Sequence, residues 1–167
     1  TEDATGKVKV FGKTDYAFSV KEDQSNAEDY SSDLIVYKQT GFKPESDLNT
    51  DQAVNVAFTH LLSQLNLTIE LRDEFNQNKE KPITAESVTD VKINGTILSS
   101  KVDFTAESIV AKVDNTQGAT AITPEVVKFN GADEKTAHPT FNYSAIVIPQ
   151  SVTSGKFSIG FKVNGNS

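Results

Sequence analysis

Hydrophobic and polar residues alternate most regularly in residues 53–71, AVNVAFTHLLSQLNLTIEL, the longest apolar-rich stretch of the chain. The apolar members form two runs: Val54, Val56 and Phe58, then Leu65, Leu67, Ile69 and Leu71. A period of two is typical of a strand with one buried and one solvated face. We therefore expect Phe58, Leu65, Leu67 and Ile69 to be buried on the inner face of one sheet. Residues 60–64 contain neither Gly nor Pro, and we expect one short helical turn there, between the two strands.

Shorter apolar runs follow one another along the rest of the chain, separated by polar segments rich in turn residues. They are residues 8–11, 16–20, 34–37, 88–93, 96–98, 102–104, 109–113, 126–129, 143–148 and 157–163. Asn94-Gly95 predicts a tight turn at the end of one of them, and residues 114–123 read as a turn-rich loop. About ten short strands at this spacing predict an all-β fold of mostly antiparallel strands, a sandwich or a barrel.

Length and charge narrow the class of protein. The 167 residues predict a single domain spanning residues 1–167. The net charge of −7 makes a nucleic-acid partner unexpected, because an acidic surface repels the phosphate backbone. No apolar run approaches the roughly 20 residues that span a bilayer. The chain has no Met, so we expect a segment before Thr1 to have been removed.

Residues with catalytic potential are few and scattered. The chain has no Cys, which excludes thiol catalysis, disulfides and Cys-ligated metals. The two histidines, His60 and His138, lie far apart in sequence, and no G-x-S-x-G motif frames a serine nucleophile. His60 lies beside Phe58 and Leu61, so we interpret it as a partly buried structural histidine whose hydrogen bonds are satisfied by the backbone. No glycine-rich phosphate loop is present. We predict that the protein is not an enzyme and binds no cofactor.

Residues 47–51 have the D-x-N-x-D spacing of a calcium loop. The match fails further on, because Gln52 stands where the loop requires Gly and Phe58 where it requires a bidentate Glu. The acidic residues within 23–33 offer a second place for a cation, although charge runs are usually solvated. We predict no specific metal site in either segment.

Carbohydrate-binding surfaces usually present flat aromatic side chains, and this chain has no Trp and four Tyr. Tyr37 and Tyr143 lie within or beside apolar runs, where a core or rim position is expected. Tyr30 lies in a polar segment and is the best candidate for an exposed contact. A glycan-binding module therefore remains an alternative to a purely structural protein.

Three segments resemble one known family when they are taken together and in order. They are FSVKEDQSNAEDYSSDLIV (residues 18–36), VNVAFTHLLSQLNLTI (54–69) and TFNYSAIVIPQSVTSGKFSIGFKVNG (140–165). They resemble the "V..DQs", "v.l.F.Hals.l.v.i" and "ivvPQt…i.i.v.g" segments of the fimbrillin-like (Mfa-like) proteins of the Bacteroidetes, and cover most of the chain.

The resemblance implies a transthyretin-like β-sandwich, the amino-terminal type of fimbrillin domain. It also implies a lipoprotein at the cell surface, associated with the outer membrane, that serves as a pilus subunit or adhesin. Pilins of this family are cut by an Arg-specific protease and assemble when a neighbouring subunit donates a strand. The family usually continues with a further strand and a second domain, so we expect this chain to be a fragment or a small divergent member.

These features lead to one functional hypothesis. We expect a non-catalytic fimbrial subunit or adhesin whose partners are other pilus subunits, an anchor protein, or a host protein or glycan. The resemblance places any lipid anchor outside this chain. An unpaired edge near residues 157–163 or 8–11 is expected to accept a donor strand. Arg72, the only arginine, follows a strong strand, so we expect maturation cleavage before Thr1 and not at Arg72.

Overall fold

The computed structural model describes residues 14–26, 28–39, 41, 43, 46, 48, 53–75, 82–131, 138–152 and 154–163. The elements named within these residues are β-strands and three short 3-10 turns. The strands are β1 (Asp15–Ser19), β2 (Ile35–Val36), β3 (Thr59–His60), β4 (Ser63–Glu70), β5 (Val88–Thr96), β6 (Ser99–Asp103), β7 (Ala111–Val113), β8 (Thr120–Ile122), β9 (Glu125–Asn130), β10 (Thr140–Val147) and β11 (Ser158–Val163). The 3-10 turns are η1 (Tyr30–Ser32), η2 (Asp73–Phe75) and η3 (Ala85–Ser87). No helix in the described part is long and apolar enough to cross a membrane.

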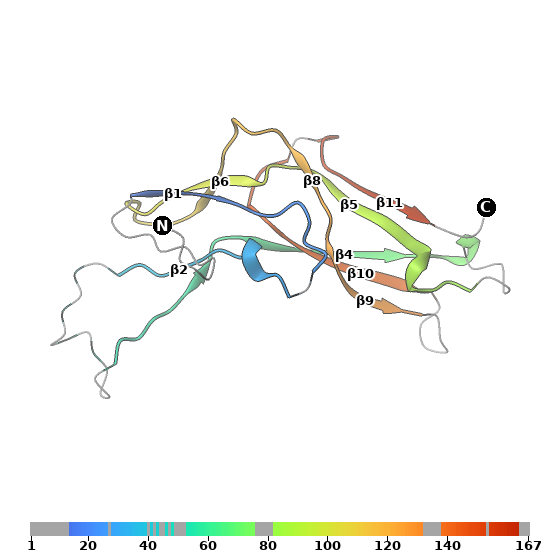
Figure 1. Ribbon diagram of the computed structural model, residues 1–167, viewed down its shortest axis with the longest axis horizontal. Coiled ribbons are helices and arrows are strands. Elements are labelled where there is room, and N and C mark those ends of the chain that lie inside the picture. Colours follow the sequence, from blue (N-terminus) through green and yellow to red (C-terminus); the bar gives the residue numbers. More distant parts are fainter. Residues whose placement is uncertain are drawn as a thin grey trace.

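The strands form antiparallel sheets, which confirms the all-β prediction. Three sheets have three strands each, in the orders β1-β6-β7, β4-β10-β9 and β11-β5-β8, and β2 pairs with β3. Figure 1 shows the sheet β11-β5-β8 lying over the sheet β4-β10-β9, in a sandwich arrangement. The runs predicted at residues 16–20, 126–129, 143–148 and 157–163 all correspond to strands.

Alternating residues of β4 and β10 supply one face of the core. Phe141, Tyr143 and Ala145 of β10 are buried, and β4 presents Ile69, Leu67 and Leu65 directly opposite them. Residues that lie opposite each other share one face of a sheet, so the whole row points inward. Ile69 is 7% exposed, while Leu65 and Leu67 are partly buried and pack against the core clusters. The predicted inner face is thus confirmed for these three residues.

The facing layer is β5, which buries Val88, Val91 and Ile93. Val88 and Val91 are three residues apart, a spacing that would normally send them to opposite faces of a strand. A register shift against β11 and a positive φ of 53° at Asp90 add one residue to β5 here. A bulge of this kind restores the inward direction after an odd step. Val88 and Val91 accordingly join Ile69, Leu71, Phe141 and Tyr143 in one buried cluster.

The first half of the central stretch is not a buried strand. Val54 forms only an isolated bridge with Leu48, and Phe58 is 62% exposed. The prediction that Phe58 is buried is therefore wrong. Figure 1 shows residues 53–58 running away from the sheets, and their apolar side chains Val54, Val56 and Phe58 are 44% to 62% exposed. We call residues 35–39 and 53–60 the arm.

The short helical turn predicted at residues 60–64 is also wrong. Thr59–His60 is β3, and β4 begins at Ser63. The intervening Leu61 donates its backbone N–H to the carbonyl of Leu34 at 2.9 Å. Pairing with the chain around β2 satisfies the backbone there, so the segment has no need of helical hydrogen bonds.

Two turn predictions are also wrong. β5 continues through Asn94-Gly95 to Thr96, because Gly95 takes a φ of 89° inside the strand and the register against β8 shifts there. An Asn-Gly pair can serve a bulge as well as a hairpin, since both require a positive φ. The expected loop at 114–123 contains β8, whose Ile122 is fully buried.

Candidate functional site

Sheet edges are the first candidate surface, since they carry unpaired backbone groups. In the described part of the chain β11 pairs only with β5, from Ser158 opposite Asn94 to Val163 opposite Val88. Among these residues the strand predicted at 157–163 therefore lies at the end of its sheet, and its acceptance of a donor strand stays a prediction. The other predicted edge, residues 8–11, lies outside the described residues.

The β11 edge is partly apolar and electrostatically anchored. Ile159 is partly buried and packs against the core, whereas Phe161 is 44% exposed. The Lys162 ammonium lies 2.6 Å from the Asp90 carboxylate. Their hydrogen bond lowers the pKa of Asp90 and raises that of Lys162. This ion pair connects β11 to β5. On its other side β11 has no neighbouring strand among the described residues.

The arm is the second candidate surface. Its large apolar side chains are exposed, from 37% at Tyr37 to 62% at Phe58. The two rings meet edge-on with centroids 6.3 Å apart. Ile35, Val54 and Val56, each between 44% and 46% exposed, extend this apolar area. Exposed apolar patches of some hundreds of Å² mark interaction surfaces in many proteins.

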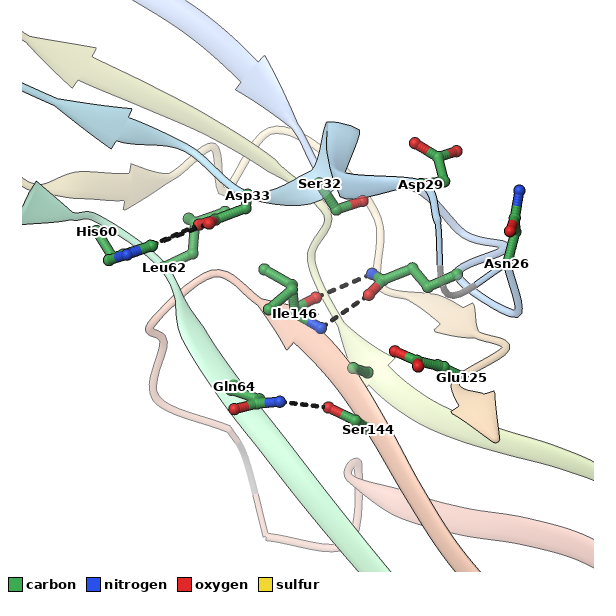
Figure 2. A pocket seen from close by; sticks show the side chains of 12 residues that line it. Asn26, Asp29, Ser32, Asp33, His60, Leu62, Gln64, Glu125, Ser144 and Ile146 are labelled. Atoms are coloured by element: carbon green, nitrogen blue, oxygen red, sulfur yellow. Dashed lines mark hydrogen bonds and ion pairs between the residues drawn. The ribbon is translucent and has the colours of Figure 1, made fainter. Parts of the chain in front are cut away.

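A polar cavity of about 430 Å³ is the third candidate (Figure 2). Its walls come from the loop after β1, from the β3–β4 segment, and from the ends of β9 and β10. The lining side chains are Gln24, Asn26, Asp29, Ser32, Asp33, His60, Leu62, Gln64, Glu125, Ser144, Ala145 and Ile146. Amides, hydroxyls and carboxylates line it together with the apolar side chains of Leu62, Ala145 and Ile146, so the cavity suits a neutral or cationic ligand that carries both hydrogen-bonding and apolar groups.

Several polar groups of the cavity are already engaged with one another. His60 Nδ1 lies 3.0 Å from the carboxylate of Asp33. Asp29 accepts a hydrogen bond from the Lys21 ammonium, which together with bonds from Ser31 lowers the pKa of Asp29 to about 2. Gln64 donates to the Ser144 hydroxyl at 2.8 Å. These contacts hold the walls in place, and the side chains in Figure 2 line the cavity without closing it.

His60 differs from its prediction. Its side chain is 68% exposed and pairs with a carboxylate, whereas the sequence suggested a partly buried histidine held by the backbone. Asp33 is 27 residues away in the chain, so sequence spacing gave no sign of the pair. His138 is partly buried in a different part of the molecule, and the structure does not bring the two histidines together.

Two glutamines of the family-like segments have clear structural roles. Ile146 donates its N–H to Gln24 Oε1 at 2.7 Å, and Gln24 Nε2 donates to the Ile146 carbonyl at 2.9 Å. Gln150 makes the same pair of bonds with the backbone of Ile97, both at 2.9 Å. Each side-chain amide thus stands in for a neighbouring strand at a backbone position that would otherwise lack partners.

The remaining predicted residues fall in different places. Tyr143 is in the core, where burial raises its pKa, and Tyr37 is exposed on the arm. The side chain of Tyr30 and most of residues 47–51 lie outside the described residues, so the absence of a calcium site stays a prediction. Arg72 follows β4, is 74% exposed, and donates from Nε to Glu70 at 3.0 Å.

The fold and its surfaces define an all-β sandwich protein with an exposed apolar arm and with edge strands that pair on one side only among the described residues. The sequence profile of the fimbrillin-like family matches residues 8–167, and the chain belongs to that family. No curated protein and no solved structure matches the chain. The family is one of structural subunits, which indicates a component of a fimbria at the cell surface.

Proposed function

We propose that this chain is a non-catalytic structural or adhesive subunit of a cell-surface fimbria, and that it assembles by accepting a donor strand at the edge of β11. Residues 1–167 act as one domain in this proposal. The partners are other fimbrial subunits or an anchor protein, and a lipid anchor outside this chain holds the assembly at the outer membrane. A host protein or glycan is the ligand of an adhesive subunit.

The observation that carries the proposal is the position of β11. It lies at the edge of the sheet β11-β5-β8 among the described residues, next to a strand that contributes Val88, Val91 and Ile93 to the core. An edge strand offers a row of N–H and C=O groups to a partner strand, and side-chain pockets add specificity. Family membership supports assembly with other subunits.

Arg72 is not the maturation site in this proposal. β4 ends two residues before it and pairs with β10 over its full length, from Ser63 to Glu70. Cleavage after Arg72 would therefore leave β4 held in its sheet and would free no terminal strand. We expect an Arg-specific protease to nick the exposed Arg72 without changing the affinity for a donor peptide.

The test uses synthetic peptides corresponding to the strand that follows in related pilins, or to the terminal strand of a partner subunit. A donor peptide that binds only the folded chain stabilises it by about 2.7 kcal/mol when the free peptide is at a hundred times Kd, and the melting temperature rises accordingly. The matched control is the same peptide with N-methyl groups along the pairing edge, which removes its backbone donors. No shift with saturating donor, or an equal shift with the methylated control, contradicts strand acceptance.

A surface glycan-binding module is the second candidate, and the polar cavity is what favours it. Its amides and carboxylates are the groups that bind sugar hydroxyls, although the chain has no Trp to stack on a sugar ring. A glycan array with the full chain tests it directly. Binding that is lost in Gln64→Ala and kept in the exposed-loop variant Gln117→Ala would favour the glycan module.

A further inference from the structure

β9 forms a second open edge, in a different sheet from β11. Among the described residues it pairs only with β10, and Figure 1 shows it at the margin of the sheet β4-β10-β9. Val126 and Val127 at its centre are 64% and 57% exposed, and Phe58 is the one other large apolar side chain in the described part that is comparably exposed. Exposed apolar side chains on an edge strand favour pairing with another strand, and this six-residue strand also carries the charges of Glu125 and Lys128 and follows Pro124.

The pairing with β10 leaves this edge irregular at its centre. Lys128 is opposite Asn142 and Val126 is opposite Tyr143, so Val127 has no partner in the register. The extra residue forms a bulge, which leaves Val127 outside the regular ladder beside the paired Val126. The side chains of both valines are exposed and can contact a strand on the outer side of β9.

The bulge also brings the two charges of this edge to one face of the sheet. Glu125 lies opposite Ser144, and Lys128 lies opposite Asn142. Ser144 and Asn142 are two residues apart in β10 and so share a face. Glu125 and Lys128 therefore share that face too, although three residues separate them. A two-fold axis perpendicular to the sheet keeps every side chain on its own face, so these two residues can pair across it.

The sequence of this edge is complementary to itself. Residues 125–128 read Glu-Val-Val-Lys. When two copies of this segment run antiparallel with Val126 opposite Val127, Glu125 of each copy lies opposite Lys128 of the other. Opposite charges and paired β-branched residues are the cross-strand combinations that stabilise an antiparallel pair. Neither Glu125 nor Lys128 forms an ion pair within the described part of the chain, so both charges are available.

We propose that the occupant of the β9 edge is a second copy of this chain, paired antiparallel about a two-fold axis. The two three-stranded sheets then join into one continuous sheet. The contact is isologous, with the same patch used by both copies, and it closes as a dimer. It leaves β11 open, since β11 belongs to the other sheet. A fimbrial subunit could therefore pair laterally through β9 while it accepts a donor strand at β11.

Charge selects one register over its neighbours. A slip that sets Val127 opposite itself places Lys128 opposite Val126 and Glu125 opposite Phe129, and both ion pairs are lost. Because a slip by one residue also turns side chains to the other face, registers are well separated in energy. The contact is short, so we expect a weak dimer whose affinity falls as salt rises.

Charge reversal tests the proposal. Sedimentation velocity of the full chain over roughly 10 µM to 1 mM measures Kd. Glu125→Lys alone and Lys128→Glu alone each set like charges opposite one another, and each should weaken the dimer at least about tenfold. The double reversal E125K/K128E restores both pairs and should return Kd to the wild-type range. Lys112→Glu, on the exposed edge strand β7, makes the same change in net charge as Lys128→Glu and should leave Kd unchanged.

A mixture of the two single variants gives the sharpest result. Chains with Glu125→Lys present two lysines at the edge and chains with Lys128→Glu present two glutamates, so the mixture should dimerise while neither does alone. Wild-type chains that stay monomeric at 1 mM overturn the proposal, as do single variants that dimerise as well as wild type. Failure of the mixture to associate overturns it as well.

Cysteine cross-linking tests the register independently of charge, because the chain has no Cys of its own. Chains with Val126→Cys mixed with chains with Val127→Cys should form mainly the mixed disulfide, since these positions are directly opposite. Homodisulfides of Val127→Cys as the main product would place the axis at Val127 and contradict the proposed pairing. No disulfide above the level of a Gln117→Cys control would contradict the contact itself.

Discussion

Replacing Gln24 should destabilise the protein far more than its partly exposed position suggests. The side-chain amide satisfies both the N–H and the C=O of Ile146, where β10 extends beyond the end of β9, and it also donates to the carbonyl of Lys21. In Gln24→Leu those groups lose their partners. A single unsatisfied backbone group costs about 1–3 kcal/mol when buried. The polar cavity lets water reach Ile146, so we expect the low end, about 2–3 kcal/mol in total.

Gln24→Glu separates the two hydrogen bonds. A carboxylate still accepts from the Ile146 N–H, but it faces the Ile146 carbonyl without a proton to donate. The folded state therefore raises the pKa of the introduced carboxyl group above its unfolded value, because the protonated form restores the missing bond. The loss of stability relative to wild type is full at pH 7, and it shrinks as pH falls through the raised pKa.

Urea unfolding followed by circular dichroism measures both variants, and the control is Gln117→Leu in an exposed loop. A loss of about 2–3 kcal/mol lowers Tm by roughly 4–12 °C for a chain of this size. A loss below about 0.5 kcal/mol for Gln24→Leu, with an unchanged m-value, would refute the view that this side chain replaces a strand at Ile146.

Three further variants test other parts of the structure. Gly95→Ala should cost more than about 3 kcal/mol, because φ is 89° and an added Cβ would overlap the backbone carbonyl oxygen of Lys156. Gly118→Ala, with nothing within 4 Å of an added Cβ, is the matched control, and equal Tm values for the two variants would contradict the bulge. Phe58→Ala should lower the free energy of unfolding by less than about 1 kcal/mol because Phe58 is 62% exposed, whereas Ile93→Ala, at 0% exposure, should lower it by about 2–5 kcal/mol. A larger loss for Phe58→Ala than for Ile93→Ala in chemical denaturation would indicate that Phe58 is buried in the core. Hydrogen bonds from the Thr116 hydroxyl and the Lys101 ammonium lower the pKa of Asp114 from 3.8 to about 2, so its contribution to stability is present above about pH 4 and lost towards pH 2. Asp114→Asn should be less stable than wild type at pH 7 and equally stable near pH 2. A stability difference that does not change with pH would contradict this account of the Asp114 pKa.

The strands that sequence predicted best are those that bury one regular face. β4 alternates regularly, and its inward residues lie opposite Phe141, Tyr143 and Ala145 of β10. β11 alternates in sequence, and its Ile159 and Val163 pack against the core clusters while Phe161 stays exposed. Residues 54–58 alternate just as strictly but extend into solvent on the arm. Periodicity reports that a segment can form a two-faced strand, and it carries no information on whether a second layer covers it.

The candidate surfaces were predictable only where they follow from strand order. The β11 strand was predicted from the alternation in residues 157–163, and β11 pairs only with β5 among the described residues. The polar cavity could not, since it needs His60, Asp33 and Ser144 brought together by pairings between distant segments. Glu125 to Lys128 could be read as self-complementary from sequence alone, but only the structure places that segment at an edge.

Hydrogen exchange along β11 tests the central claim most directly, by comparing the isolated chain with the same chain in assembled fimbriae. The outward amides of β11 should exchange quickly in the isolated chain and become strongly protected on assembly, while the amides of β5 are protected in both states. Slow exchange along β11 before assembly, or no gain in protection after it, would contradict strand acceptance at this edge.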